Sequence, residues 1–190
     1  MRVEKLIFPG MLIGIAFLIG MTSLLMAHPG KAAASPTRND QAIQPAAAQK
    51  STGCSISSAY PESIRQWCAM IEQYARDNGL DPNLVSAVML RESAGSPDAY
   101  SKSGAVGLLQ VMPRDGKAAS FVCPNGPCFA NRPSMQELFD PEFNISYGTR
   151  MLAQLIQRNG DLREALKAYG PRDVGYYYAD LIIGTMNNYR

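Results

Sequence analysis

One glutamate, Glu92, is placed where it could serve as a general acid and base. It stands at the end of a predicted helix, and the glycine-rich residues 101–110, SKSGAVGLLQ, follow it. Glycines let chain segments approach closely because they lack side chains, so this stretch could form one wall of a groove with Glu92 on its floor. A carboxyl partly buried there could donate a proton and later accept one. The alternative is a solvated glutamate at a helix end, which spacing alone favours.

The remaining residue types exclude several other chemistries. The single histidine, His28, lies outside the part of the chain predicted to fold, which excludes histidine triads and zinc sites with histidine ligands there. Lysine and arginine number 18 against 16 aspartate and glutamate, a formal charge of +2, with no block of one sign. This balance does not provide the basic patch that nucleic-acid binding needs.

All four cysteines, Cys54, Cys68, Cys123 and Cys128, lie in the part predicted to fold. In an exported protein an even number of cysteines indicates disulfides, and four cysteines allow three pairings. The sequence CPNGPC predicts a turn that brings Cys123 to Cys128, which leaves Cys54 to pair with Cys68. A four-cysteine zinc site is the rival interpretation, but these spacings do not match paired two-residue knuckles.

The first 53 residues predict export and a tether. Residues 6–27 carry no charged side chain and follow Arg2 and Lys5. At about 1.5 Å per helical residue they could cross a bilayer, so we interpret residues 1–27 as a signal peptide or an uncleaved membrane anchor. Residues 28–53 are rich in Ala, Pro, Gln, Ser and Thr and predict a disordered linker.

Residues 54–190 form the predicted folded domain, and most of its patterns are helical. Apolar side chains recur at helical spacing, and Asp-Pro pairs or a single aspartate mark the starts of several helices. The predicted helices cover residues 61–78, 81–93, 140–159, 161–169 and 174–189. The Gly- and Ser-rich residues 99–113 predict turns or a short hairpin. The fold class is therefore mainly α, one compact helical domain with a short hairpin or loop region beside the groove.

A longer pattern surrounds Glu92 and extends to the end of the chain. Its first part, which has no gap in its spacing, comprises Glu92-Ser93, Ala99, Ser101, Gly104-Ala105, Gly107-Leu108, Gln110 and Met112-Pro113. This part resembles the signature of the soluble lytic transglycosylase family. The resemblance continues through Asp140-Pro141, Asn144-Ile145, Gly148, Met151-Leu152, Ala168-Tyr169 and Tyr178, and it covers residues 62–190.

The resemblance implies a lysozyme-like α+β fold and a peptidoglycan lytic transglycosylase. Such an enzyme cleaves the bond between N-acetylmuramic acid and N-acetylglucosamine and leaves a 1,6-anhydromuramoyl product. Glu92 would be its sole catalytic acid and base. The residues implied to contact the sugar or position Glu92 are Ser93, Ser101, Gln110, Tyr169 and Tyr178. No metal and no organic cofactor is implied.

Three positions depart from the family pattern. Gly95 stands where the family usually has an aromatic residue, which predicts a more open wall of the sugar site. Gly170 replaces an asparagine that normally contacts substrate. Three consecutive tyrosines, Tyr176, Tyr177 and Tyr178, leave the register of the active-site tyrosine open by one, and the resemblance favours Tyr178.

Two other functions remain open beside the transglycosylase. A lysozyme-type hydrolase needs a second carboxylate to direct water, and Asp98 is the nearest candidate, although a turn residue is its simpler interpretation. A noncatalytic peptidoglycan-binding scaffold is the other alternative. The expected partners are peptidoglycan glycan strands, a secretion or conjugation machine, and the membrane if residues 1–27 stay uncleaved. The expected location is the periplasm or cell envelope, with or without an inner-membrane anchor.

Overall fold

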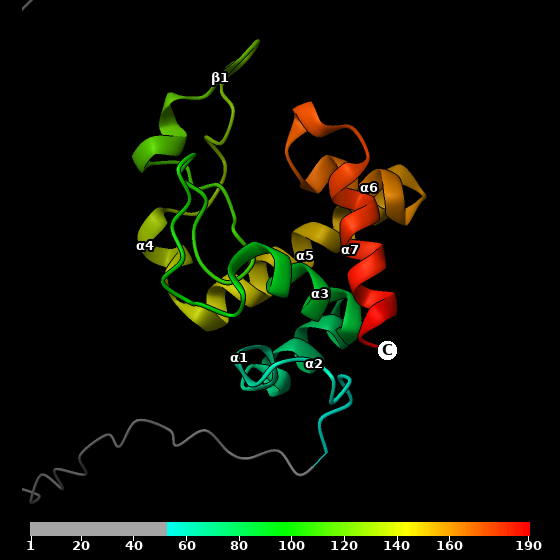
Figure 1. The fold of residues 1–190 in the computed structure, drawn as a ribbon. Helices are drawn as coiled ribbons and strands as arrows, with labels where there is room; N and C mark the ends of the chain where they lie inside the picture. The colour runs from blue at the N-terminus through cyan, green and yellow to red at the C-terminus, as the bar shows by residue number, and fades with distance from the viewer. Residues whose placement is uncertain (1–52) are drawn as a thin grey trace, which may run out of the picture. The chain divides into compact units, whose positions relative to one another are not determined.

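The computed structural model describes residues 53–190, which form a mainly helical domain (Figure 1). The predicted signal peptide or anchor, and all of the predicted linker except Gly53, lie outside the described residues. The elements in chain order are α1 (Glu62–Arg65), α2 (Cys68–Asp77), α3 (Pro82–Ser93), η1 (Gly116–Ser120), β1 (Val122–Cys123), β2 (Gly126–Pro127), α4 (Met135–Leu138), α5 (Pro141–Asn159), α6 (Leu162–Tyr169), η2 (Arg172–Val174) and α7 (Tyr177–Asn188). Within residues 53–190 no helix combines the length and apolar character that crossing a bilayer requires.

The helices pack around α3 and α5. Helix α3 contacts α2 and α7, while α5 contacts α2, α4 and α6, and α6 in turn contacts α7. Figure 1 shows the segment that contains η1, the hairpin and α4 on one side of these two helices and α6 with α7 on the other. Six consecutive residues of α3, 84–89, are buried, so this helix is covered on every side over nearly two turns. Such a buried helix holds its carboxyl end firmly in place.

Local sequence signals explain where the long helices begin. Asp81, Asp140 and Asp161 each accept a hydrogen bond from a backbone N–H in the first turn of α3, α5 and α6, respectively. Proline follows the first two of these aspartates, at a position where its missing N–H costs nothing. The predicted starts of these three helices are therefore confirmed.

Two predicted helices differ from the structure at their amino-terminal ends. The helix predicted over residues 61–78 is divided into α1 and α2, because Trp67 leaves helical geometry and its indole Nε1 donates to Gly95 O at 3.0 Å. The last helix begins at Tyr177 instead of Val174. Gly175 adopts a φ of 59°, which interrupts the chain after the short turn η2.

The segment between α3 and α5 contains the domain's few strand pairings. Residues 99–113 form turns with isolated bridges between Tyr100 and Val106 and between Val106 and Val111, as the glycines predicted. A hairpin follows, in which β1 pairs antiparallel with β2. Helix α4 was not predicted, although its capping box, formed by Ser134 and Glu137, is a recognisable sequence signal.

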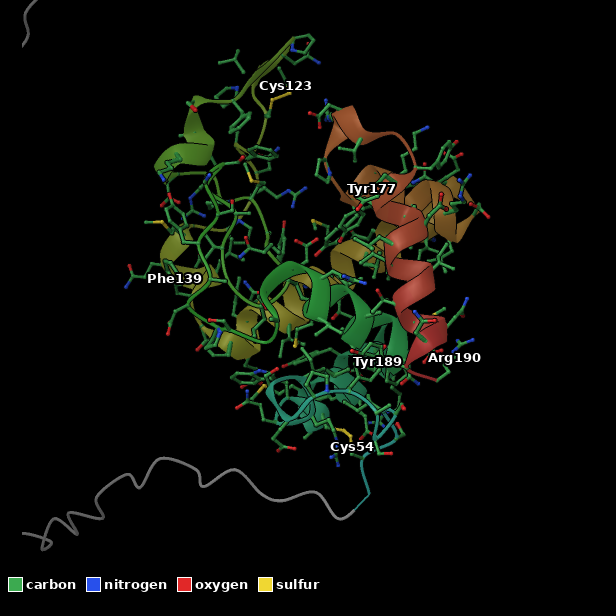
Figure 2. All side chains as sticks on the ribbon, viewed as in Figure 1. Cys54, Cys123, Phe139, Tyr177, Tyr189 and Arg190 are labelled. Carbon is green, nitrogen blue, oxygen red and sulfur yellow. A yellow bond between two sulfur atoms is a disulfide. The ribbon has the colours of Figure 1, made fainter. Side chains whose placement is uncertain are left out.

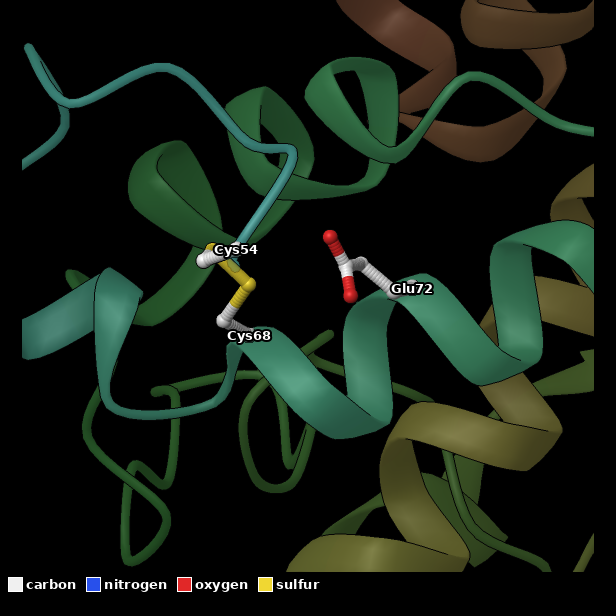
Figure 3. A group of neighbouring side chains, drawn as sticks. All are labelled: Cys54, Cys68 and Glu72. Carbon is white, nitrogen blue, oxygen red and sulfur yellow. A yellow bond between two sulfur atoms is a disulfide. The ribbon is translucent and has the colours of Figure 1, made fainter. Parts of the chain in front are cut away.

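The domain contains two disulfides, and their pairing is the one that the spacing of the cysteines favoured. Cys123 is bonded to Cys128 across the hairpin turn, and Cys54 is bonded to Cys68 at the start of α2 (Figures 2 and 3). The Glu72 carboxylate lies beside the second bond and accepts from the backbone N–H of Ser55. Because the sulfurs of Cys54 and Cys68 are bonded to each other, this group lacks the thiolates that a zinc site needs.

Candidate active site

Glu92 lies in the last turn of α3, where the buried helix reaches the surface. The chain then leaves helical geometry through Ala94, with a φ of 52°, and Gly95, with a φ of 85°. A Cβ atom at Gly95 would lie 2.1 Å from the carbonyl oxygen of Ser63, so this position faces α1 and is filled by backbone. The prediction that Gly95 opens one wall of the sugar site is therefore wrong.

Ser93 joins α3 to the glycine-rich segment. Its hydroxyl donates to Leu108 O at 2.8 Å and accepts from the N–H of Gly95 at 3.1 Å. These bonds hold the turn after Glu92 against residues 107–110. Ser93 therefore links the backbone that follows Glu92 to the glycine-rich segment.

Ser101 and Gln110 stabilise the conformation of the glycine-rich segment. The Ser101 hydroxyl accepts from Ala105 N at 2.9 Å and closes a tight turn. Gln110 has a φ of 45°, and its Nε2 donates to Ala99 O at 3.1 Å and to Gly107 O at 2.9 Å. In this structure both side chains bond to backbone, and neither bonds to Glu92.

Asn144 is a structural centre that the sequence analysis named only as part of the family pattern, without a role. It is fully buried at the start of α5, where its Nδ2 donates to Val106 O and Leu138 O and its Oδ1 accepts from Leu109 N, all within 2.9 Å. A Cβ atom at Gly107 would lie 2.2 Å from Asn144 Nδ2, which explains the glycine there. Its place in the family pattern was the available signal, and that signal does not reveal its partners.

Tyr178 is the tyrosine that contacts Glu92. Its hydroxyl donates to Glu92 Oε1, and its side chain is 9% exposed. The neighbouring Tyr177, labelled in Figure 2 at the start of α7, is 69% exposed, and Tyr176 donates to Glu164 of α6. The geometry therefore separates three adjacent tyrosines whose sequence register was open.

Tyr169 supports Tyr178 from the other side. The two rings stack with centroids 6.4 Å apart and planes 9° apart, and the Tyr169 hydroxyl donates to Leu109 O at 2.7 Å. The contacts thus connect α3, the glycine-rich segment, α6 and α7 around one carboxyl group. Gly170 ends α6 directly beneath Tyr178: a Cβ there would lie 2.5 Å from the ring.

The environment of Glu92 raises its proton affinity. Burial raises the pKa of the Glu92 carboxyl from 4.5 to about 7, and the hydrogen bond from Tyr178 opposes part of that rise. Burial and the nearby Glu92 charge raise the pKa of the Tyr178 hydroxyl well above its usual value, so it stays a donor. A carboxyl with a pKa near 7 is present in both protonation states at neutral pH, as a group that is acid and then base requires.

Asp98 lies in the turn 96–99 and is exposed. Among the described residues, no second carboxylate contributes to the shift in the pKa of Glu92. Within residues 53–190 the side chain that bonds to the Glu92 carboxyl is Tyr178, whereas most glycosidases place a second carboxyl across the bond that they cleave.

The family of the chain follows from its sequence. Residues 69–175 match the model of the transglycosylase SLT domain, so the chain belongs to this family. It is 38% identical over 97 residues to endo-type membrane-bound lytic murein transglycosylase A of Klebsiella pneumoniae. The aligned residues cover 51% of this chain and 45% of that protein. It is 36% identical over 96 residues to membrane-bound lytic murein transglycosylase E of Buchnera aphidicola, which covers 50% and 42%, respectively.

Two further similarities are to a phage protein and to a solved structure. A transglycosylase of enterobacteria phage PRD1 is 34% identical over 104 residues, which covers 55% of this chain and 34% of that protein. An inactive variant of the lytic transglycosylase Slt from Pseudomonas aeruginosa has 27% identity and a TM-score of 0.44, with coverage of 68% of this chain and 22% of that chain. The matched region therefore spans less than half the length of each of these curated relatives.

Proposed function

We propose that this protein is a peptidoglycan lytic transglycosylase that uses Glu92 as its only catalytic acid and base. It cleaves the β-1,4 bond between N-acetylmuramic acid and N-acetylglucosamine and forms a 1,6-anhydromuramoyl end. One observation carries the proposal: a half-buried glutamate with a pKa of about 7, held by the Tyr178 hydroxyl and without a second carboxylate in its hydrogen-bonded surroundings. Family membership and the names of the relatives support the same reaction.

In the first step Glu92 acts as the acid. Its protonated carboxyl gives its proton to the glycosidic oxygen as the bond from that oxygen to the muramoyl C1 breaks, and the shortened strand leaves with a hydroxyl group. The positive charge that develops at C1 is stabilised by the sugar's own 2-acetamido group. This group takes the part that a second carboxylate plays in most glycosidases.

In the second step Glu92 acts as the base. The carboxylate takes the proton of the muramoyl C6 hydroxyl while the C6 oxygen bonds to C1 and closes the 1,6-anhydro ring. Glu92 is protonated again at the end of the cycle, and no water is consumed. A pKa near the working pH serves both steps, since neither protonation state is costly to reach.

Tyr178 keeps the carboxyl of Glu92 in one orientation during both steps. Ser93, Ser101 and Gln110 shape the backbone that faces the sugar, and the Oε1 of Gln110 is available to accept from a sugar hydroxyl or amide. Tyr169 fixes Tyr178 and contributes to the wall. The hydrogen bonds at each residue support these roles.

Mass spectrometry of the products tests the reaction. The purified full-length protein is incubated with peptidoglycan, beside Glu92→Gln and the control Glu62→Gln, which changes an exposed glutamate of α1. We expect wild type and Glu62→Gln to release muropeptides one water lighter than reducing-end muropeptides, and Glu92→Gln to release none. Hydrated products would indicate a hydrolase instead, and binding without release by the wild-type protein would indicate a scaffold.

We further propose that the domain acts in the cell envelope after export. Two disulfides in the domain support an oxidising compartment, and relatives are named as membrane-bound. A domain tethered near a membrane is suited to opening the wall locally, as a secretion or conjugation system requires. Sequencing of the mature amino terminus from cell-envelope fractions distinguishes a cleaved signal peptide from a retained anchor.

A further inference from the structure

A groove of about 260 Å³ lies between the turn 127–132 and one face of α5. It contains neither Glu92 nor Tyr178. Two arginines, two amide side chains and several apolar side chains form its lining, and no aspartate or glutamate is among them. The lining residues are Pro127, Cys128, Phe129, Ala130, Asn131, Arg132, Tyr147, Met151, Gln154, Leu155 and Arg158.

The charge of this groove is not balanced by the protein around it. Within residues 53–190, neither Arg132 nor Arg158 makes an ion pair, whereas Arg65, Arg114, Arg163 and Arg190 each do. Asn131 and Gln154 add amide N–H donors, and Leu155 adds apolar surface. The sulfur of Met151 accepts from Nη1 of Arg132, which holds this guanidinium at the groove. This mixture suits a carboxylate carried on a short, partly apolar chain, because arginine pairs with carboxylates through two parallel hydrogen bonds.

The wall that carries Arg132 is fixed by bonds of its own. The Cys123–Cys128 disulfide closes the hairpin next to it, and Cys128 N donates to Phe121 O at 2.9 Å. Arg132 N donates to Phe129 O at 2.9 Å, and its guanidinium carbon lies 5.8 Å from the centroid of the Phe129 ring. The groove is therefore shaped before any ligand arrives, which reduces the entropy cost of binding.

Two observations connect this groove to the candidate active site. Arg114, four residues after Gln110, donates through its backbone N–H to Pro133 O at 2.9 Å and through its guanidinium to Arg132 O at 3.2 Å. Burial and the charge of Glu92 raise the pKa of the Tyr169 hydroxyl, and the charge of Arg132 lowers it. These contacts join the wall that carries Arg132 to the segment after Gln110, and the charge of Arg132 acts on Tyr169, the ring that stacks on Tyr178.

We propose that the groove binds the free carboxylate groups of the peptide attached to the muramoyl residue, with Arg132 and Arg158 as the charged partners. The proposal rests on the proposed function, since only a peptidoglycan substrate brings such a peptide to Glu92. Muramoyl residues carry short acidic peptides with aliphatic segments between their carboxylates. The groove offers charged, amide and apolar side chains that match the carboxylates, amides and aliphatic segments of such a peptide.

Peptide binding tests the groove without any turnover. Titration calorimetry in the Glu92→Gln background measures the Kd of a soluble acidic stem tripeptide and of the same peptide with its carboxylates amidated. Arg132→Gln combined with Arg158→Gln is expected to weaken binding of the free acid about tenfold or more, since charge-assisted bonds are lost. The control Arg76→Gln, an exposed arginine of α2 outside the groove, should retain the Kd of the parent protein.

Amidation should weaken binding to the parent protein and have little effect on the double variant. Equal Kd values for the parent and the double variant, with circular dichroism showing both folded, would overturn the proposal. Equal affinity for the free and amidated peptides would overturn it as well.

Turnover separates this proposal from the proposed function. The KM for peptide-bearing glycan strands is compared with the KM for strands whose peptides were removed by an amidase. We expect the wild-type protein to favour peptide-bearing strands and the double variant to lose most of that preference. Peptide binding that depends on the two arginines, without cleavage of either strand, would refute the proposed function and leave the groove assignment intact. Cleavage with the same preference in both proteins would refute the groove assignment alone.

Discussion

Restoring the family's asparagine at Gly170 is expected to lower activity. The backbone there has a φ of −76°, which any residue adopts, so the conflict is purely steric. A Cβ atom would lie 2.5 Å from both Cγ and Cδ1 of Tyr178, and an ordinary contact requires at least 3.4 Å. The ring must therefore move by most of an ångström, but Tyr169 stacks on it and Glu92 holds its hydroxyl.

The size of the effect follows from these contacts. Overpacking of a well-filled site costs about 1 to 3 kcal/mol of stability. The displaced hydroxyl loses a hydrogen bond to a charged group, worth about 1.5 to 3 kcal/mol, so kcat/KM is expected to fall about 10- to 100-fold. Release of soluble muropeptides measures activity, and urea unfolding measures stability. Gly184→Asn in α7 is the matched control, because a Cβ there meets no atom within 4 Å.

A double-variant cycle locates the cause of the loss. If the clash with Tyr178 is responsible, Tyr178→Ala should remove most of the stability cost of Gly170→Asn, because the two effects share one contact. Wild-type activity and stability in Gly170→Asn would refute the reasoning and would mean that the ring yields without cost.

Three more outcomes are expected around the same site. Tyr178→Phe should raise the pKa of Glu92, because the bond that lowers it is lost, and the alkaline limb of kcat/KM should move up by about 1 to 2 pH units; an unchanged limb would contradict this. Burial raises the pKa of Glu92 from 4.5 in the unfolded chain to about 7 in the folded protein, so between these pH values the folded state binds more protons than the unfolded state. The free energy of unfolding should therefore fall by up to about 3 kcal/mol as the pH rises from 4.5 through 7. Glu92→Gln should therefore unfold at higher urea than wild type at pH 8 but not at pH 4.5, and equal midpoints at pH 8 would contradict the shift. Asn144→Leu should cost about 2 kcal/mol or more in urea unfolding, because it leaves Leu109 N and Leu138 O buried without partners and Val106 O with the N–H of Val111 alone. The exposed Asn187→Leu should cost little, and equal costs would refute the role of Asn144.

Short-range signals account for what the sequence determined. Asp81, Asp140 and Asp161 cap helices through bonds to residues two or three positions later, so their effect can be read without knowledge of the fold. The hairpin disulfide joins cysteines five positions apart, and a turn sequence lies between them. The family pattern around Glu92 is also continuous in sequence, which is why the candidate glutamate could be named.

Contacts between distant segments decided the rest. Glu92 and Tyr178 are 86 positions apart, and helical periodicity does not say which of three adjacent tyrosines meets the carboxyl. The raised pKa of Glu92 arises from burial by other elements, and the tight fits at Gly95 and Gly170 depend on Ser63 and Tyr178. Asn144 and the groove at Arg132 and Arg158 likewise exist only once α5 packs against residues 106–132. Charge, burial and steric fit depend on all neighbouring atoms, and only the tertiary structure brings those atoms together.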